Sequence, residues 1–266
     1  TFDMSDFDRM RMDFTMKANN FELINTRKKV QSMVFGKVYA NYLGTLKGTT
    51  SNLSLRGKLE VLDRTDVTYI LKNSPLSVDD CLHDLVQFTN FNDTTRVEEK
   101  KALNESGIDL TLGISISDAA IFHCNLSEDG QSYVNLEGGG DLTFRMTQQG
   151  DMRMTGRFTT NSGEMKYQLP VIPLKTFQLV QGSYVEFTGD VMNPTLSIAA
   201  KERTKAVVTE NDQQRSVAFD VGVKLSQPLN EMGLEFTIEA PEDLNIQNQL
   251  ASMSADQRGK AAVTMM

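Results

Sequence analysis

The side chains that most often bind zinc, histidine and cysteine, occur in this chain as two close pairs. Cys81 and His83 are separated by one residue, and His123 and Cys124 are adjacent. Zinc takes four such nitrogen and sulfur ligands, but neighbouring residues of a strand point to opposite faces, so His123 and Cys124 do not easily share a metal ion. We therefore expect ordinary packing or surface positions and no metal. A disulfide between Cys81 and Cys124 stays open as an alternative, because its geometry is not readable from sequence.

Acidic residues occur in pairs that resemble, at first sight, the two carboxylates of a glycosidase. That chemistry needs two carboxyl groups held at a fixed separation in a cleft, one of them with a raised pKa. Nothing in the spacing singles out such a pair, so solvated loop charges explain these residues better. They are Asp63, Asp66, Asp79, Asp80, Glu98 and Glu99.

The sequence also lacks the signatures of a phosphate loop and of an activated nucleophile. No Lys-Ser or Lys-Thr follows Gly138-Gly-Gly140, and no helix is predicted there, so a β-bulge is the better explanation of these glycines. Ser183 and Thr188 have no histidine within a recognisable motif. We therefore predict a protein that is not an enzyme, with no catalytic residue and no cofactor.

Composition narrows the possible partners. The 266 residues carry a formal net charge of −8, which argues against nucleic acid, since nucleic-acid-binding proteins present a basic patch. No apolar run reaches the roughly 18 to 20 residues that span a bilayer. Because the chain begins at Thr1 and ends without a polar tail, we expect it to be a segment of a longer protein, whose targeting signals lie elsewhere.

Strict alternation of apolar and polar residues is the dominant pattern, and it predicts the elements that position every side chain. The segments 108–116, 134–146, 217–225 and 234–238 place apolar residues at every second position. Such strands give the sheet one apolar face and one wet face. Glycine and polar clusters separate the runs at intervals of roughly ten residues, which favours an antiparallel meander of short strands.

Glycines inside these strands predict a curved sheet. Gly113, Gly138 to Gly140 and Gly156 interrupt runs that are otherwise regular, as glycine does at bulges and sharp bends. Bending folds the apolar face inward and gives either a packed sandwich or barrel, or an open trough. Periodicity does not distinguish a filled interior from a trough.

Helix signals are clear only in the tail. Pro241-Glu-Asp precedes Leu244, Gln247, Leu250 and Met253 at helical spacing, which predicts an amphipathic helix. With so few helices, the apolar face of the sheet must be covered by another part of the sheet, by a partner or by a ligand. Leu244, Leu250 and Met253 either close the end of the trough or bind a partner.

Four runs of the chain carry a resemblance to a known family. They are Gly138-Gly-Gly-Asp-Leu142, Ser162-Gly-Glu-Met-Lys-Tyr167, Phe177-Gln-Leu-Val-Gln-Gly-Ser183 and Asn193-Pro-Thr-Leu-Ser-Ile-Ala199. In this order they resemble the C-terminal region of the TamB family, known as the translocation and assembly module domain, in its Bacteroidetes form. The family usually has Trp at the position of Phe187 and Pro after the position of Asp190, so the chain departs from the pattern at these two places. The resemblance covers nearly the whole chain.

The resemblance implies a fold and a role. The fold is all-β: an elongated, strongly curved antiparallel β-sheet trough (β-taco-like) with an apolar interior and a short C-terminal helix. Its parts are upstream strands (1–100), the signature sheet (101–240) and an amphipathic helical tail (241–266). TamB-like proteins are similar to AsmA-like and bridge-like lipid-transfer proteins. They lie in the Gram-negative periplasm, are anchored in the inner membrane by a region that would lie outside this segment, and work with an outer-membrane TamA/BamA-like barrel.

The implied ligand is the acyl chains of phospholipids, moving between the two membranes along the apolar face. The fourteen methionines suit such a lining, because an unbranched thioether adapts to irregular guests. The expected lining residues are Leu53, Leu55, Leu59, Val61, Ile108, Leu110, Leu112, Ile114, Val134, Leu136, Leu142, Phe144, Met152, Met154, Phe158, Met165, Tyr167, Phe177, Leu179, Leu196, Ile198, Val217, Phe219, Val221, Val223, Leu234 and Phe236.

Two other interpretations stay open. In one, the domain offers sheet edges to nascent barrel strands and supports outer-membrane protein assembly by strand addition. In the other, it is a structural β module with a closed core. A bulky charge at Leu110, Leu142 or Phe219 distinguishes them, because a closed core should unfold whereas an open trough should stay folded and lose its lipid.

Overall fold

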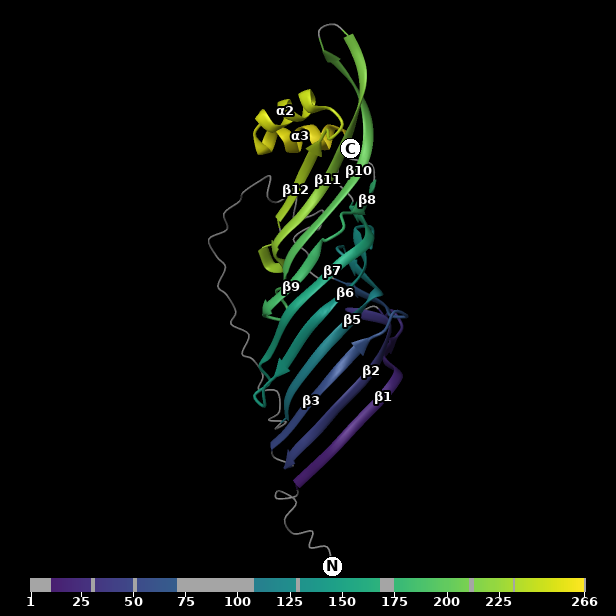
Figure 1. The fold of residues 1–266 in the computed structure, drawn as a ribbon, viewed down its shortest axis with the longest axis vertical. Coiled ribbons are helices and arrows are strands. Elements are labelled where there is room, and N and C mark those ends of the chain that lie inside the picture. The colour runs from purple at the N-terminus through teal and green to yellow at the C-terminus, as the bar shows by residue number, and fades with distance from the viewer. Residues whose placement is uncertain are drawn as a thin grey trace, which may run out of the picture.

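The described residues form an elongated, mixed twelve-stranded sheet with two short α-helices at one end, as a computed structural model shows (Figure 1). The structure describes residues 11–29, 32–49, 52–70, 108–127, 130–167, 175–210, 213–231 and 233–265. The predicted all-β class is confirmed. No helix among these residues is both long and apolar enough to cross a membrane.

The strands vary from five to eighteen residues in length. The alternating segments 108–116, 134–146, 217–225 and 234–238 of the sequence lie within four of these strands, β5, β6, β11 and β12. The strands are β1 (Arg11–Thr26), β2 (Val34–Thr49), β3 (Asn52–Val61), β4 (Asp66–Ile70), β5 (Ile108–Asn125), β6 (Tyr133–Met146), β7 (Met152–Tyr167), β8 (Lys175–Leu179), β9 (Tyr184–Gly189), β10 (Thr195–Glu210), β11 (Gln213–Pro228) and β12 (Gly233–Glu239).

The sheet is mixed, whereas the sequence predicted an antiparallel meander. The strands follow the order β1-β2-β3-β5-β6-β7-β8-β10-β11-β12, with β4 beside β2 and β5, and β9 beside β7 and β10. β5 runs parallel to both β3 and β4. Parallel neighbours need a connection of a dozen residues or more. Residues 71–107 supply its length. Their sequence offers a helix candidate at 78–86 and, as the better interpretation, a strand at 85–91, and both lie outside the described residues.

The strand registers place the predicted apolar positions on one continuous face. Leu59 pairs with Ile114, Ile114 with Leu142, and Phe158 with Val185. Residues that pair directly across strands share a face. The same alternation therefore extends from β1 to β12, and we call this side of the sheet the apolar face.

Along one line across the sheet, strands either end and are replaced by another strand or change their register with a neighbour. We call this line the crease. β3 and β4 share the position between β2 and β5, and β9 and β8 share the position between β7 and β10. Register shifts occur at the same level in neighbouring strands. We call the side that holds β3 and β9 the first wall, and the side that holds β4 and β8 the second wall. The crease comprises residues 19–20, 62–65, 117–119, 137–138 and 180–183.

Glycines allow the strands to approach closely at the crease. A Cβ atom on Gly138 or Gly140 would overlap backbone carbonyl oxygens of Thr159 and Arg157 on β7. Glu137 pairs with Ser162 and Gly138 pairs with Thr160, so the extra residue is Asn161 of β7. On the other side of β6, residues 117–119 of β5 lie opposite Gly139. The bulges therefore lie on the two neighbouring strands, opposite the glycines where the sequence predicted them.

The core fills the angle of the crease. The Phe122 ring of the second wall meets the Phe158 ring of the first wall edge to face, with centroids 5.2 Å apart and planes at 79°. Such aromatic pairs add stability beyond the apolar area that they bury. Buried residues continue along the crease in two clusters. The larger contains Val134, Leu136, Met165, Phe177, Leu196, Ile198, Val223 and Leu225; the smaller contains Val38, Ala40, Leu59, Val61 and Val67.

The predicted helical tail is two helices, α2 (Leu244–Ser252) and α3 (Ala255–Met265). The Asp243 side chain caps α2 by accepting a hydrogen bond from the Ile246 amide at 3.1 Å. Ser254 and Gln257 exchange side-chain to backbone hydrogen bonds, which is a capping box that starts a second helix. The break at Ser254 is the reason that one helix does not continue through the tail.

Candidate functional site

The part of the apolar face farthest from the crease carries one uninterrupted row of apolar side chains. Register connects Phe14 with Leu46, Leu46 with Leu55, Leu55 with Leu110, Leu110 with Met146, and Met146 with Met152. Phe14 is 53% exposed and Met152 51% exposed, while the other four are partly buried. These six residues, one from each of β1, β2, β3, β5, β6 and β7, are called the rim row below.

Beside the rim row the sheet has a patch without side chains of its own. Gly44 of β2 and Gly57 of β3 pair directly across the strands on the apolar face. The side chain of Tyr42 lies over both glycines, so that a Cβ on either would meet its ring or hydroxyl. The Tyr42 hydroxyl is buried without a hydrogen-bond partner among the described residues, and burial raises its pKa. The candidate site is therefore apolar almost throughout.

The predicted lining residues divide by their distance from the crease. Most residues near the crease or under the helices are buried by the chain itself. Residues toward the rim row, those of β12, and Leu179 at the end of β8 are only partly covered, and Met152 is exposed. The side chain of Tyr167 lies outside the described part. The buried ones are Leu59, Val61, Val134, Leu136, Leu142, Phe158, Met165, Phe177, Leu196, Ile198, Val217, Phe219, Val221 and Val223; the partly covered ones are Leu53, Leu55, Ile108, Leu110, Leu112, Ile114, Phe144, Met154, Leu179, Leu234 and Phe236.

Sequence reasoning left out the first two strands of this surface. Phe14 and Met16 of β1 and Leu46 of β2 lie on the apolar face, in register with the predicted lining. The alternation of Met12, Phe14 and Met16 signalled a strand, but it did not show which sheet face that strand would extend. In β2 the glycines at 44 and 48 break the apolar alternation, so Leu46 gave no comparable signal.

The titratable residues form structural contacts. His123 lies on the opposite face from Cys124, as predicted: its Nδ1 is 2.6 Å from Asn135 Oδ1 and its Nε2 is 3.2 Å from Asp66 Oδ1. Cys124 packs on the larger core cluster, where burial raises its pKa to about 11. Among the residues that the structure describes, no three potential ligands gather around one point. Cys81 and His83 lie outside those residues, so the disulfide stays a prediction.

The remaining residues considered for catalysis are apart from one another. The Ser183 hydroxyl donates to the Val180 carbonyl oxygen at 2.7 Å and accepts from the Ala199 amide at 3.1 Å, so it holds the crease together. Thr188 and Asp63 are exposed. Asp79, Asp80, Glu98 and Glu99 lie outside the described residues.

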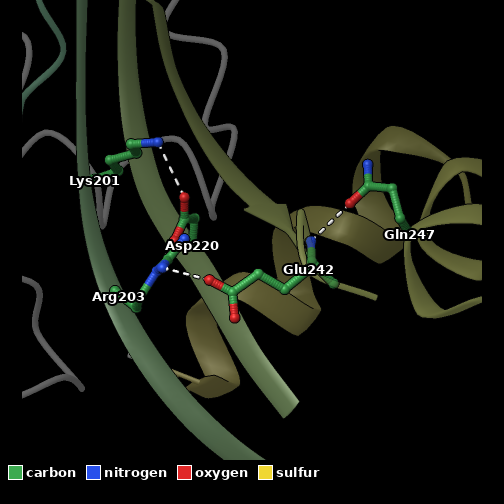
Figure 2. Close-up of polar contacts among 6 residues, drawn as sticks. Lys201, Arg203, Asp220, Glu242 and Gln247 are labelled. Carbon is green, nitrogen blue, oxygen red and sulfur yellow. Dashed lines mark hydrogen bonds and ion pairs between the residues drawn. The ribbon is translucent and has the colours of Figure 1, made fainter. Parts of the chain in front are cut away.

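A charged cluster that the sequence analysis missed lies on the opposite face of β10 and β11, beside the start of the helices (Figure 2). The Asp220 carboxylate, 8% exposed, accepts from Lys201 Nζ at 3.0 Å and from Arg203 Nε at 2.8 Å. Arg203 also donates to Glu242 at 2.7 Å. The hydrogen bond from Arg203 lowers the pKa of Asp220 and outweighs the effect of burial.

Of the three helix residues expected to bind a partner or to close the trough, one is buried in the fold. Leu250 packs with Ile246 against β11 and β12, whereas Leu244 is 77% exposed and Met253 37% exposed. The structure thus uses Leu250 for covering the sheet and leaves the other two accessible.

A comparison with protein-family models decides the relationship of this domain. The model of the TamB C-terminal domain matches residues 1–261. The chain belongs to the TamB C-terminal domain family. No curated protein matches it significantly. Membership in the TamB family supports a role in translocation and assembly within the Gram-negative envelope, as a structural and transport module, and TamB-family proteins in general work with TamA-type partners.

Proposed function

We propose that this TamB domain conducts phospholipids between the inner and outer membranes along its apolar face. It does so as a periplasmic segment whose inner-membrane anchor lies in another region of the protein, and it supports outer-membrane protein assembly or secretion together with a TamA/BamA-like barrel. The rim row is the observation that carries the proposal. It is an apolar surface that crosses six neighbouring strands and that the chain leaves incompletely covered.

The dimensions and energetics of the rim row suit an acyl chain. Strands about 4.8 Å apart give the row a length of about 24 Å over its five intervals. Each methylene group that moves from water to this surface gains about 0.8 kcal/mol at full burial. This surface therefore binds an acyl chain without any polar site. The flexible side chains of Met146 and Met152 let it adapt to the shape of that chain.

Native mass spectrometry with lipid extraction tests the proposal on two neighbouring substitutions. Leu110→Asp places a charge in the rim row, and we expect it to abolish co-purified phospholipid while the protein stays folded, because water already reaches this position. Thr111→Asp is the matched control, since Thr111 pairs with Arg56 on the opposite face. It should keep the lipid of the unmodified protein. Equal lipid content in both variants, or none in the unmodified protein under gentle conditions, would contradict lipid conduction.

A second candidate, strand addition, is favoured by the ribbon of β10 and β11. Beyond Lys201, β10 pairs only with β11, and before Asp220, β11 pairs only with β10, among the described residues. Figure 1 shows this ribbon extending past the helices. An unpaired strand edge is a template for another strand.

Strand addition predicts a periodic pattern of crosslinking along β10. Cysteines placed singly at positions 203 to 209 should crosslink to strands of a purified TamA/BamA-like barrel with a two-residue alternation, because alternate residues face the same side. Cysteines in β3, which has a neighbour on each side, provide the control. Uniform or absent crosslinking along 203 to 209 would remove this candidate.

A further inference from the structure

The helices α2 and α3 lie on the same face of the sheet that carries the rim row. Ile246, Leu250 and Ala262 pack in one cluster with Val217, Phe219 and Val221 of β11 and Ile238 of β12. These strand residues belong to the apolar face, since Val221 pairs with Ile238 and Val223 pairs with Phe236. Figure 1 shows both helices beside the C-terminal end of β12, with the ribbon of β10 and β11 extending past them. The C-terminal end of the apolar face is thus covered by the chain's own tail.

The covered end is continuous with the rest of the apolar face. Phe236 packs against both the cluster under the helices and the larger cluster of the crease. Its neighbours along β11, Val221 and Val223, belong to one cluster each. Asp220 and Lys224 of β11 point to the other face, whereas Glu202 of β10, which pairs with Val221, lies on this face. Without the helices, the exposed apolar residues would extend from β1 to Val217 of β11.

Two ionic contacts hold the start of the tail, one from each face of the ribbon. On the apolar face, Arg215 binds the side chain of Asp243, the residue that caps α2. On the opposite face, Arg203 joins Glu242 to the buried Asp220 (Figure 2). The Asp243 carboxylate has a lowered pKa, first because of its hydrogen bond from Arg215 and second because of the Ile246 amide. Two adjacent acidic residues of the tail are therefore held by ion pairs, Glu242 by Arg203 of β10 and Asp243 by Arg215 of β11.

The helix pair depends on these contacts, because it has little stability of its own. α2 has nine residues and α3 has eleven, and helices of this length are marginal in water when they are isolated. Gly259 lies in the middle of α3, which weakens it further. Only Ile246, Leu250 and Ala262 are fully buried in the two helices. On the tail side of the contacts, Glu242 is 63% exposed, so water competes for it.

From this arrangement we infer that α2 and α3 are a removable cover, and that the surface of Val217, Phe219, Val221 and Ile238 beneath them is a second acyl-chain site. The inference rests on the proposed function, since the occupant is the same phospholipid tail that the rim row would bind. The apolar helix residues occupy this surface until the two ionic contacts open. Lipid and helices then compete for one surface, and the cover regulates the C-terminal end of the path.

A phospholipid with a photoreactive group at the end of one acyl chain tests the cover on the whole chain. The released variant combines Arg215→Ala, which removes one contact, with Glu242→Gln, which removes the charge from the other, and it leaves Val217, Phe219, Val221 and Ile238 unchanged. Its matched control combines Arg157→Ala with Glu186→Gln, an ion pair of 2.9 Å between β7 and β9. Adducts are mapped to peptides by mass spectrometry, and hydrogen exchange of residues 244–265 is measured in parallel.

In the released variant we expect exchange in 244–265 to rise at least tenfold and adducts to appear at 217–221. The unmodified protein and the control variant should show adducts near Leu55 and Leu110 only. Unchanged exchange in the released variant, or fast exchange without adducts at 217–221, would overturn the cover. The two proposals fail separately, because loss of adducts at Leu55 and Leu110 in every variant would overturn lipid conduction itself. Protection of β6 and β7 amides establishes that each variant is folded, and Glu242→Gln alone serves if the double variant is not.

Discussion

The crease and the rim row are built from the same kinds of residue on the same face of one sheet, yet only the crease is packed. Met165 and Met152 show the contrast within one strand: both lie on the apolar face of β7, and Met165 is 0% exposed whereas Met152 is 51% exposed. At the crease, side chains of the first wall pack against side chains of the second wall. At the rim row only one wall is present. Apolar residues therefore stabilise the fold in one region and stay available to a guest in the other.

Truncating the two methionines should separate these roles most strongly. We expect Met165→Ala to lower the free energy of unfolding by about 2 to 5 kcal/mol, because it leaves a cavity in a filled core. Met152→Ala should change it by no more than about 0.5 kcal/mol, since the side chain is already largely in water. Urea denaturation followed by circular dichroism measures both. Similar losses in the two variants would mean that the rim row is part of a closed core.

The rate of cysteine alkylation should differ between the crease and the rim row. Because burial raises the pKa of Cys124 to about 11, its thiolate is scarce at pH 8, and we expect alkylation about a hundredfold slower than for an ordinary thiol with a pKa of about 8.5. A cysteine introduced by Leu55→Cys in the rim row should react at the ordinary rate. Iodoacetamide labelling in a Cys81→Ser background measures each site. Fast labelling of Cys124 in the folded protein would show that the crease opens.

Acid should reveal how much the charged cluster on the opposite face of β10 and β11 adds to the stability of the fold. The lowered pKa of Asp220 means that its stabilising contribution is present above the unfolded carboxyl pKa of about 3.9 and is lost as pH falls through the lower folded value. We expect Asp220→Asn to cost about 1 to 2 kcal/mol at pH 7, a modest value because Lys201 and Arg203 are half exposed. The difference from the unmodified protein should shrink below pH 4 in thermal melts. A difference independent of pH would assign the effect to packing.

The smallest expected effect concerns the glycine patch beside the rim row. Tyr42→Phe removes a buried hydroxyl that has no partner among the described residues. We expect stability to stay the same or to rise by up to about 1 kcal/mol, because no hydrogen bond is lost with the hydroxyl. Tyr42→Ala should lower it, since the ring covers Gly44 and Gly57. A loss of stability in Tyr42→Phe would show that the hydroxyl has a partner in solution.

Much of the fold was predictable from local patterns. Alternation in 108–116 and 217–225 predicted strands that the structure contains, whereas the bulges predicted at glycines 138–140 lie on β5 and β7, opposite these glycines. The helical spacing of Leu244 and Leu250 predicted the tail. The same patterns missed the parallel pairing of β5, because its partners are selected by a connection through 71–107 that carries no clear periodic signal.

The candidate site was predictable as a set of residue types, but not as a surface. Sequence assigned Met165 and Met152 the same role. It gave no sign that Arg203 would meet Asp220 and Glu242, or that Arg215 would meet Asp243. Which apolar residues of the predicted lining are covered depends on contacts between the two walls, whose strands are far apart in sequence.

By itself the sequence determined that this chain is all-β, that each strand has one apolar side, and that the domain is of the TamB type. Only the tertiary structure decided where that side is filled, where it is open and where the tail covers it. The reason is physical. Alternation follows from the backbone geometry of each strand alone, whereas burial requires a second surface, and its position is set by the crease and by the pairing of distant strands.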